Sequence, residues 1–134
     1  MANIKIFNPA GLAKPAGTYS QIAQAKSNEI VFIAGQVPTD ASGNVIGKGD
    51  FETQCAQTYA NIHTALRAVG ADWANVVQFT TFLVRQEDAP VLRAYRGREF
   101  PKMFPGGSPP NTLLIINRLA DPDYLLEVQT IAAL

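Results

Sequence analysis

Residues 29–40, EIVFIAGQVPTD, decide the fold of this chain. Five consecutive residues in this stretch, 30–34, are apolar, so a strand here carries apolar side chains at both odd and even positions. Because successive side chains of a strand point to opposite faces of the sheet, both faces of this strand must be kept from water. The segments 113–116 (LLII) and 76–84 (VVQFTTFLV) repeat the pattern. The sequence therefore predicts a sheet that is covered on two sides.

The length and the charge of the chain limit its class. The 134 residues fit one domain over residues 1–134, and a chain of this size buries roughly two-thirds of its unfolded surface. Eleven basic and eleven acidic residues give no net charge, which argues against binding to nucleic acid or to an anionic membrane. The N-terminal sequence lacks the apolar core of a signal peptide, and no apolar stretch approaches the roughly 18 residues of a membrane span. A cytoplasmic protein is expected, in agreement with a single cysteine.

Turn residues and hydrophobic periodicity divide the chain into six strands and two helices. Strands are expected at residues 4–7, 19–25, 29–34, 76–84, 111–116 and 125–132. Over residues 51–69, apolar side chains recur at spacings of 4, 4, 3, 4 and 3, which is the period of a helix, with Asp50 as its N-cap and Gly70 as its stop signal. A second helix is expected over residues 89–100, ending before Pro101 because the residue before a proline avoids the helical conformation.

Two helices for a mixed sheet of about six strands indicate an α+β fold with both helices on one face. On the other face, residues 30–34 and 113–116 would expose a larger apolar patch than soluble monomers tolerate. We therefore expect a closed homo-oligomer in which another subunit supplies the second cover.

Few residues of the chain can carry nucleophilic or metal chemistry. The single cysteine, Cys55, and the single histidine, His63, lie eight residues apart on the first helix, about 12 Å along its axis, and cannot form a hydrogen bond with each other. We interpret Cys55 as a core side chain and His63 as a surface or interface residue. No metal cluster can be built from this pair, and the glycines of residues 43–49 (GNVIGKG) match no phosphate-binding or dinucleotide motif, so neither a metal nor a cofactor is expected.

Several of these segments also carry a resemblance that spans nearly the whole chain. They are Tyr19-Ser20-Gln21, Gly35-Gln36-Val37-Pro38, Asn61-Ile62 with Leu66 and Val69-Gly70-Ala71, Val76-Val77, and Glu127-Val128-Gln129-Thr130-Ile131-Ala132. In them the chain resembles the reactive intermediate deaminase family, Rid, also called YjgF or endoribonuclease L-PSP. The resemblance implies a chorismate-mutase-like subunit and a barrel-shaped homotrimer with small-molecule pockets at the subunit interfaces.

The resemblance breaks at the residue that binds substrate. Deaminating members of the family hydrolyse enamines or imines released by pyridoxal-phosphate enzymes, and they hold the substrate carboxylate with an arginine in a Pro-x-Arg-Ser/Thr motif. Here the motif reads Pro109-Pro110-Asn111-Thr112. Arginine presents a charged planar fork that matches a carboxylate, whereas asparagine presents a short neutral amide. Imino acids are therefore expected to be poor ligands, unless a nearby cation compensates: the candidates are Arg93, Arg96, Arg98 and Arg118, which otherwise read as solvated charges.

The resemblance also implies the rest of the pocket. Ala34, Leu113 and Leu92 stand where the family often has polar or cysteine side chains, so the pocket is expected to be less polar. Gly35 and Thr112 belong to the matching motifs that line it. Tyr19 would close the site from the adjacent subunit, and Glu127 would orient the attacking water. From the residues alone, Glu127 reads first as a solvated side chain, while an interface aromatic is the alternative for Tyr19 and a turn cap is the alternative for Asn111.

These observations favour a diverged, cofactor-free hydrolase of the Rid type. In this hypothesis Glu127 and backbone groups near Leu113 position water against the carbon–nitrogen double bond of a small substrate that is not a typical 2-imino acid, while Asn111 and Tyr19 orient it. The alternative is a non-catalytic trimer that binds a small metabolite or a partner protein in the same pocket. An endoribonuclease is the third reading, for which one histidine, a neutral charge and no basic aromatic surface offer little.

Overall fold

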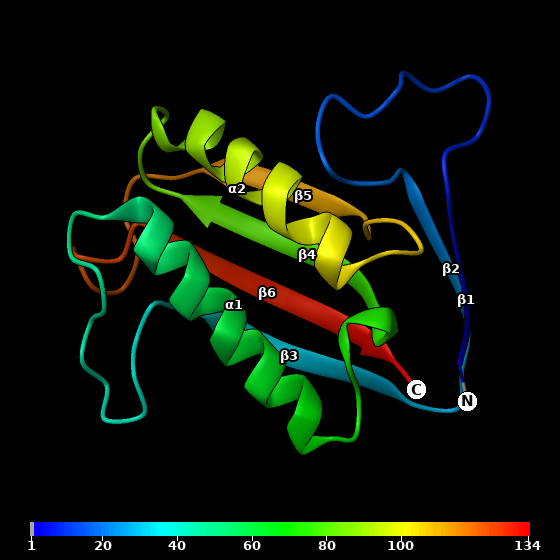
Figure 1. The fold of residues 1–134 in the computed structure, drawn as a ribbon, viewed down its shortest axis with the longest axis horizontal. Coiled ribbons are helices and arrows are strands. Elements are labelled where there is room, and N and C mark those ends of the chain that lie inside the picture. Colours follow the sequence, from blue (N-terminus) through cyan, green and yellow to red (C-terminus); the bar gives the residue numbers. More distant parts are fainter. Residues whose placement is uncertain (1) are drawn as a thin grey trace.

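The computed structural model describes residues 2–134, and its elements follow the predicted order (Figure 1). Strands β1 (Asn3–Phe7), β2 (Ile22–Lys26) and β3 (Ile30–Gln36) come first. Helix α1 (Phe51–Ala68), a short 3-10 turn (Trp73–Asn75) and strand β4 (Val76–Leu83) follow. Helix α2 (Asp88–Met103) and strands β5 (Asn111–Ile115) and β6 (Leu126–Ala133) complete the chain. The fold is α+β, as the sequence predicts.

The six strands form two sheets, which corrects the expectation of one sheet of about six strands. The main sheet is mixed and has the order β3-β6-β4-β5, while β1 and β2 form a separate antiparallel ribbon. In Figure 1 the ribbon runs across the end of the main sheet, so β2 and β3 are not paired although only residues 27–29 connect them. The ribbon instead places Ile4 and Ile6 beside Trp73 and Phe104 around a small apolar hollow.

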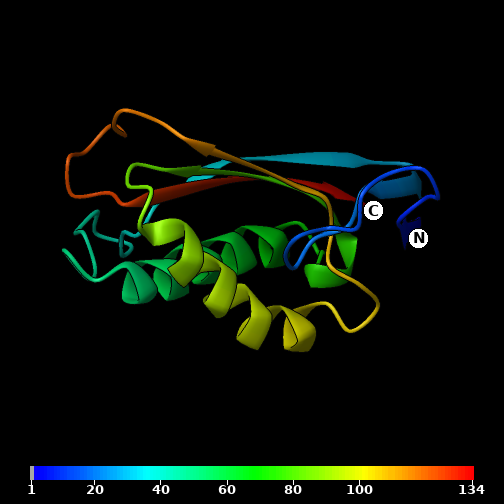
Figure 2. The ribbon, with the colours of Figure 1, turned by 90° about the horizontal axis from the view of Figure 1, so that it is seen from above.

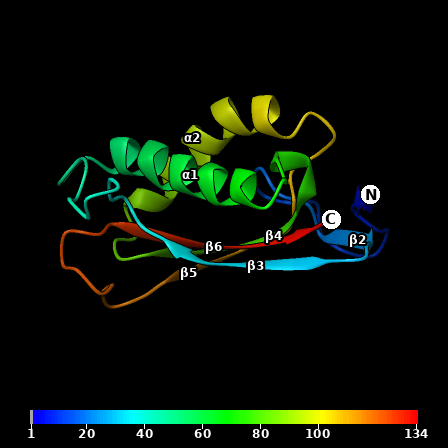
Figure 3. The same cartoon turned by 90° about the horizontal axis from the view of Figure 1, so that it is seen from below.

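Both helices lie on the same face of the main sheet, as Figures 2 and 3 show from two directions. Side chains of Phe79, Leu83, Leu126 and Val128 point from the central strands toward the helices and are fully buried. On α2, Phe100 is also fully buried and packs edge-on against Tyr59 of α1, with ring centroids 5.5 Å apart. The hydrophobic core therefore lies between the sheet and the helices.

The opposite face of the sheet carries exposed apolar side chains, which no other part of residues 2–134 covers. Ile30 and Phe32 of β3 are 51% and 74% exposed, and Leu114 of β5 is 40% exposed. On its other face, strand β3 buries Ile33 toward the helices. The prediction of strands with two apolar faces is thus confirmed for β3, while a second subunit as the cover of the outer face stays a prediction.

The ends of the helices follow the sequence signals with one exception. The Asp50 side chain caps α1 by accepting a hydrogen bond from the backbone N–H of Thr53, 3.2 Å long, and Gly70 beyond its end has φ +76°, which favours glycine. The prediction that α2 stops at Phe100 is wrong, because the helix continues through Pro101 to Met103. A proline in the last turn costs one backbone hydrogen bond, and the C-cap residue Phe104 still donates to the carbonyl of Phe100 at 2.7 Å.

Among residues 2–134, neither helix has the length and the hydrophobicity that a membrane span requires.

Candidate functional site

A pocket of about 230 Å³ lies between α2, the first residues of β5 and the loop that precedes β2. Helix α2 lines it with four residues at helical spacing, which share one face of the helix: Ala89, Leu92, Arg93 and Arg96. Asn111 and Leu113 of β5 form the facing wall, and Ala16, Gly17, Thr18 and Tyr19 form the rim. Three of the residues expected at the site, Tyr19, Asn111 and Leu113, are thus brought together.

A hydrogen-bonded network forms the polar part of this pocket. The side-chain carbonyl oxygen of Asn111 accepts hydrogen bonds from the Thr81 hydroxyl at 2.7 Å and from Arg96 Nη2 at 3.2 Å. Arg96 Nη2 also donates to Thr81 Oγ1 at 2.7 Å, and Arg96 Nε donates to the Tyr59 hydroxyl at 3.1 Å. Asn111 therefore does not simply cap a turn: its carbonyl oxygen helps to hold an arginine in the wall of the pocket.

Glu127 lies on the other face of the sheet. Its neighbours Leu126 and Val128 are fully buried toward the helices, so the alternation of β6 directs Glu127 away from them. A methyl group on Gly35 would come within 2.6 Å of the Glu127 carboxyl carbon, which places this carboxylate directly over the glycine. The pairing of β3 with β6 shifts register between Ile33 and Gln36, and this bulge is the site of Gly35.

The expected site residues therefore fall into two groups on opposite faces of one sheet. Tyr19, Asn111 and Leu113 line the pocket beside α2. Glu127, Gly35 and the exposed Ala34 belong to the outer face, and Thr112 points there too because it alternates with Asn111. A single copy of the chain does not bring the two groups together.

The four candidate cations also separate in the structure. Arg98 pairs with Glu52 of α1, and Arg118 donates to the backbone carbonyls of Leu119 and Ala120. Arg93 and Arg96 both line the pocket, Arg93 being exposed and Arg96 only 6% exposed. The spacing of residues 89, 92, 93 and 96 was the sequence signal for this shared face, but it did not show which neighbours the face would meet.

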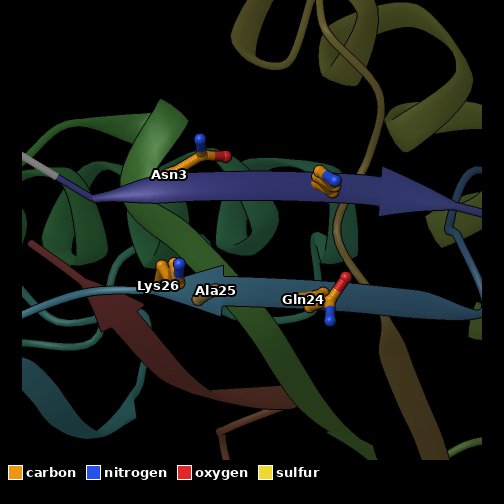
Figure 4. Close-up of a pocket in the computed structure, with 5 residues that line it drawn as sticks. Asn3, Gln24, Ala25 and Lys26 are labelled. Carbon is orange, nitrogen blue, oxygen red and sulfur yellow. The ribbon is translucent and has the colours of Figure 1, made fainter.

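The other hollows and reactive side chains among residues 2–134 are weaker candidates for a functional site. Asn3, Gln24 and Lys26 stand on one face of the β1–β2 ribbon around an open hollow (Figure 4), and the predicted site residues lie elsewhere. His63 is half-buried, contacts Asp72 Oδ1 at 2.9 Å and stacks on Trp73. Cys55 is fully buried, which confirms it as a core side chain. Within residues 2–134, no group of three histidine, cysteine, aspartate or glutamate residues is placed to hold a metal ion.

Known proteins resemble this chain in sequence and in structure. The family model described as Endoribonuclease L-PSP matches residues 11–134. A RutC family protein of Pyrococcus horikoshii is 33% identical over 119 residues, which is 89% of each chain, and one of Pyrococcus abyssi is 32% identical over 89% of this chain and 88% of its own.

Solved structures share the fold. YyfB of Yersinia pestis, described as a protein of unknown function in the conserved Rid family, has a TM-score of 0.87 at 29% identity and covers 98% of this chain and 99% of its own. Escherichia coli TdcF with bound serine has a TM-score of 0.70 at 22% identity, covering 96% of this chain and 98% of its own, and shows the fold alone. With the family model matching almost the full length, this chain belongs to the Rid family, the family of endoribonuclease L-PSP.

Proposed function

We propose that this protein is a cofactor-free hydrolase that acts on the carbon–nitrogen double bond of a small substrate, an enamine or an imine. The substrate lies in the pocket between α2 and β5, where Tyr19 and the wall around Asn111 and Leu113 orient it. Glu127 positions the attacking water as a general base. The substrate is not a typical 2-imino acid, because position 111 offers an amide instead of a guanidinium.

The observation that carries this proposal is the division of the site between two faces of the sheet. Glu127 and Gly35 lie on the outer face of the sheet, which also exposes Ile30 and Phe32, and the pocket lies at the edge strand β5 beside α2. In this proposal the outer face of one copy packs against the β5 edge of the next, so that the carboxylate of the first completes the pocket of the second. Repetition of this head-to-tail contact closes a ring, and a homotrimer satisfies the expectation from the family fold.

The first experiment measures ammonia release from a panel in which 2-imino acids, generated in place by an amino-acid oxidase, are compared with other small imines, generated by an amine oxidase. We expect Glu127→Gln to lower turnover by about 10²-fold or more, because general-base catalysis contributes on that scale. Gly35→Ala should have a similar effect, since the added methyl group displaces the carboxylate. Glu29→Gln, which removes an exposed carboxylate outside both groups, is the matched control. Equal turnover by Glu127→Gln and the parent chain would contradict the proposal.

The alternative function is a trimer that binds a metabolite without changing it. The same division of the site favours this alternative. The pocket of a single copy can hold a ligand by itself, whereas catalysis needs the Glu127 carboxylate of a neighbouring copy. Binding of a small ligand with no ammonia release from any member of the panel identifies this function.

A further inference from the structure

Arg96 is a buried cation with no anionic partner among the residues that the structure describes. Its side chain is 6% exposed, and the atoms that accept its hydrogen bonds, from Tyr59, Thr81 and Asn111, are all neutral. The nearby ring of Phe100, with its centroid 5.3 Å from the guanidinium carbon, adds a weak cation–π contact. Buried charges in proteins are normally paired, because an unpaired one loses its hydration without compensation.

The carboxylates near the pocket do not supply the missing charge. Asp88, which is itself buried on α2, forms two hydrogen bonds of 2.8 Å with Arg85. Glu99 pairs with Lys102, and Glu52 pairs with Arg98. Within residues 2–134, Arg96 and Arg93 are therefore left facing the pocket without an acid, one in its wall and one at its rim.

The orientation of Arg96 leaves one end of its guanidinium available. Nε and Nη2 donate hydrogen bonds to the neutral oxygens of Tyr59, Thr81 and Asn111. Nη1 makes no hydrogen bond to any described residue, and it is not among the unpaired atoms that are fully buried. Because Arg96 lines the pocket, this nitrogen is open to a molecule inside it. A guanidinium held by several hydrogen bonds loses little freedom when it binds an anion.

We propose that Arg96 binds the carboxylate of the ligand, so that a cation on α2 takes over the anion recognition that position 111 on β5 cannot provide. Asn111 is then a positioning residue, which orients the ligand by fixing the guanidinium with its side-chain oxygen. Arg93 adds positive charge at the rim. The inference rests on the proposed function only in placing the ligand in this pocket. It makes the substrate a small acid that differs from a typical 2-imino acid of the family in having its carboxylate toward Arg96 on α2 and not toward position 111 on β5.

The test compares pyruvate with its neutral amide, pyruvamide, in titration calorimetry, where no chemical step is needed. We expect pyruvate to bind and pyruvamide to bind at least about 30-fold more weakly, as for the loss of one member of a buried charge pair. Arg96→Met should abolish the difference between the two compounds. Arg98→Met, which removes an arginine paired with Glu52 on the surface, should leave it unchanged.

Asn111→Asp is the decisive variant because it has the shape of the parent side chain and keeps the fold. It places a carboxylate where the amide oxygen now accepts from Arg96 at 3.2 Å, and so neutralises the guanidinium internally. We expect a higher melting temperature together with loss of pyruvate binding. A purely structural Arg96 would give the higher melting temperature with pyruvate binding retained.

The outcomes separate this inference from the proposed function. Equal binding of pyruvate and pyruvamide, binding of neither, or unchanged pyruvate binding in Asn111→Asp would overturn the role of Arg96. Ammonia release that depends on Glu127 would then still stand as evidence for hydrolysis. Conversely, selective pyruvate binding without turnover supports the role of Arg96 in a non-catalytic trimer.

Discussion

Burial raises the pKa of the Cys55 thiol from 9.0 to about 12, and the nearby Arg96 guanidinium opposes part of this effect. The reactive form of cysteine is the thiolate, which is therefore almost absent in the native protein near neutral pH. Burial raises the pKa of Tyr95 from 10.0 to about 12 and that of Tyr59 in the same direction. At the scale of the residue, these buried thiol and hydroxyl groups therefore stay protonated and do not act as nucleophiles near neutral pH.

We predict that native Cys55 is not alkylated by iodoacetamide at neutral pH and is alkylated completely in urea, as mass spectrometry measures. The raised pKa also sets a pH dependence. Above about pH 9 the unfolded chain loses the thiol proton while the native chain keeps it, so the free energy of unfolding falls as the pH rises toward 12. Cys55→Ala should lose less stability over this range, with the tyrosines accounting for the remainder. Rapid native alkylation would show that Cys55 is not buried.

Residues whose role depends on local sequence were predictable, and those that depend on distant contacts were not. Asp50 and Gly70 follow from helix-end chemistry, and Cys55 follows from the apolar stripe. Arg96 belongs to the same face of α2 as Leu92, but its partners Tyr59, Thr81 and Asn111 come from three other elements. Sequence spacing along one helix carries no information about those contacts.

At the scale of the element, the cap of α1 offers a clean measurement. The Asp50 carboxylate accepts hydrogen bonds from the backbone N–H of Thr53 at 3.2 Å and from its hydroxyl at 2.7 Å. We predict that Asp50→Ala lowers the free energy of unfolding by about 1 kcal/mol, measured by urea unfolding. Asp50→Asn retains a capping oxygen and should lie within a few tenths of a kcal/mol of the parent. Equal losses in both variants would assign the effect to charge instead of capping.

The elements were predictable from periodicity to within a few residues, but their assembly was only partly so. Strand β2 begins at Ile22 and not at Tyr19, because the backbone N–H of Gln21 is bound to the Asn8 side chain at 2.7 Å in the preceding loop. The β1–β2 ribbon does not pair with β3, because Ile4 and Ile6 of the ribbon pack near Trp73 instead. An alternating strand pattern identifies a strand and its faces, not the neighbour to which it pairs.

At the scale of the whole molecule, we expect the outer face of the sheet to determine whether copies of the chain assemble. We predict that Phe32→Asp converts the oligomer to a monomer in size-exclusion chromatography with light scattering, because the most exposed phenylalanine of that face would have to bury a charge. Val69→Asp, at an exposed apolar residue after α1, is the matched control and should keep the parent mass. A parent chain that is already monomeric would contradict this prediction.

The candidate site was predictable in composition but not in arrangement. The resemblance pointed to Tyr19, Gly35, Asn111 and Glu127, and nothing in the sequence showed that the sheet separates them into two groups. The separation follows from strand alternation combined with strand order, and strand order is a property of the folded chain. We therefore expect a complete site to form only when copies of the chain assemble.

Strand β3 is one of the two edges of the main sheet, and residues 27–29 turn the ribbon away from it. Its outward row of amide and carbonyl groups consequently offers a template on which any extended polypeptide can add. A protomer that has not yet met another copy exposes both this edge and the apolar residues of the outer face, so we expect it to be the form most prone to aggregate. We therefore expect dilution, which slows association between copies, to lengthen the time that each protomer spends with the edge of β3 exposed.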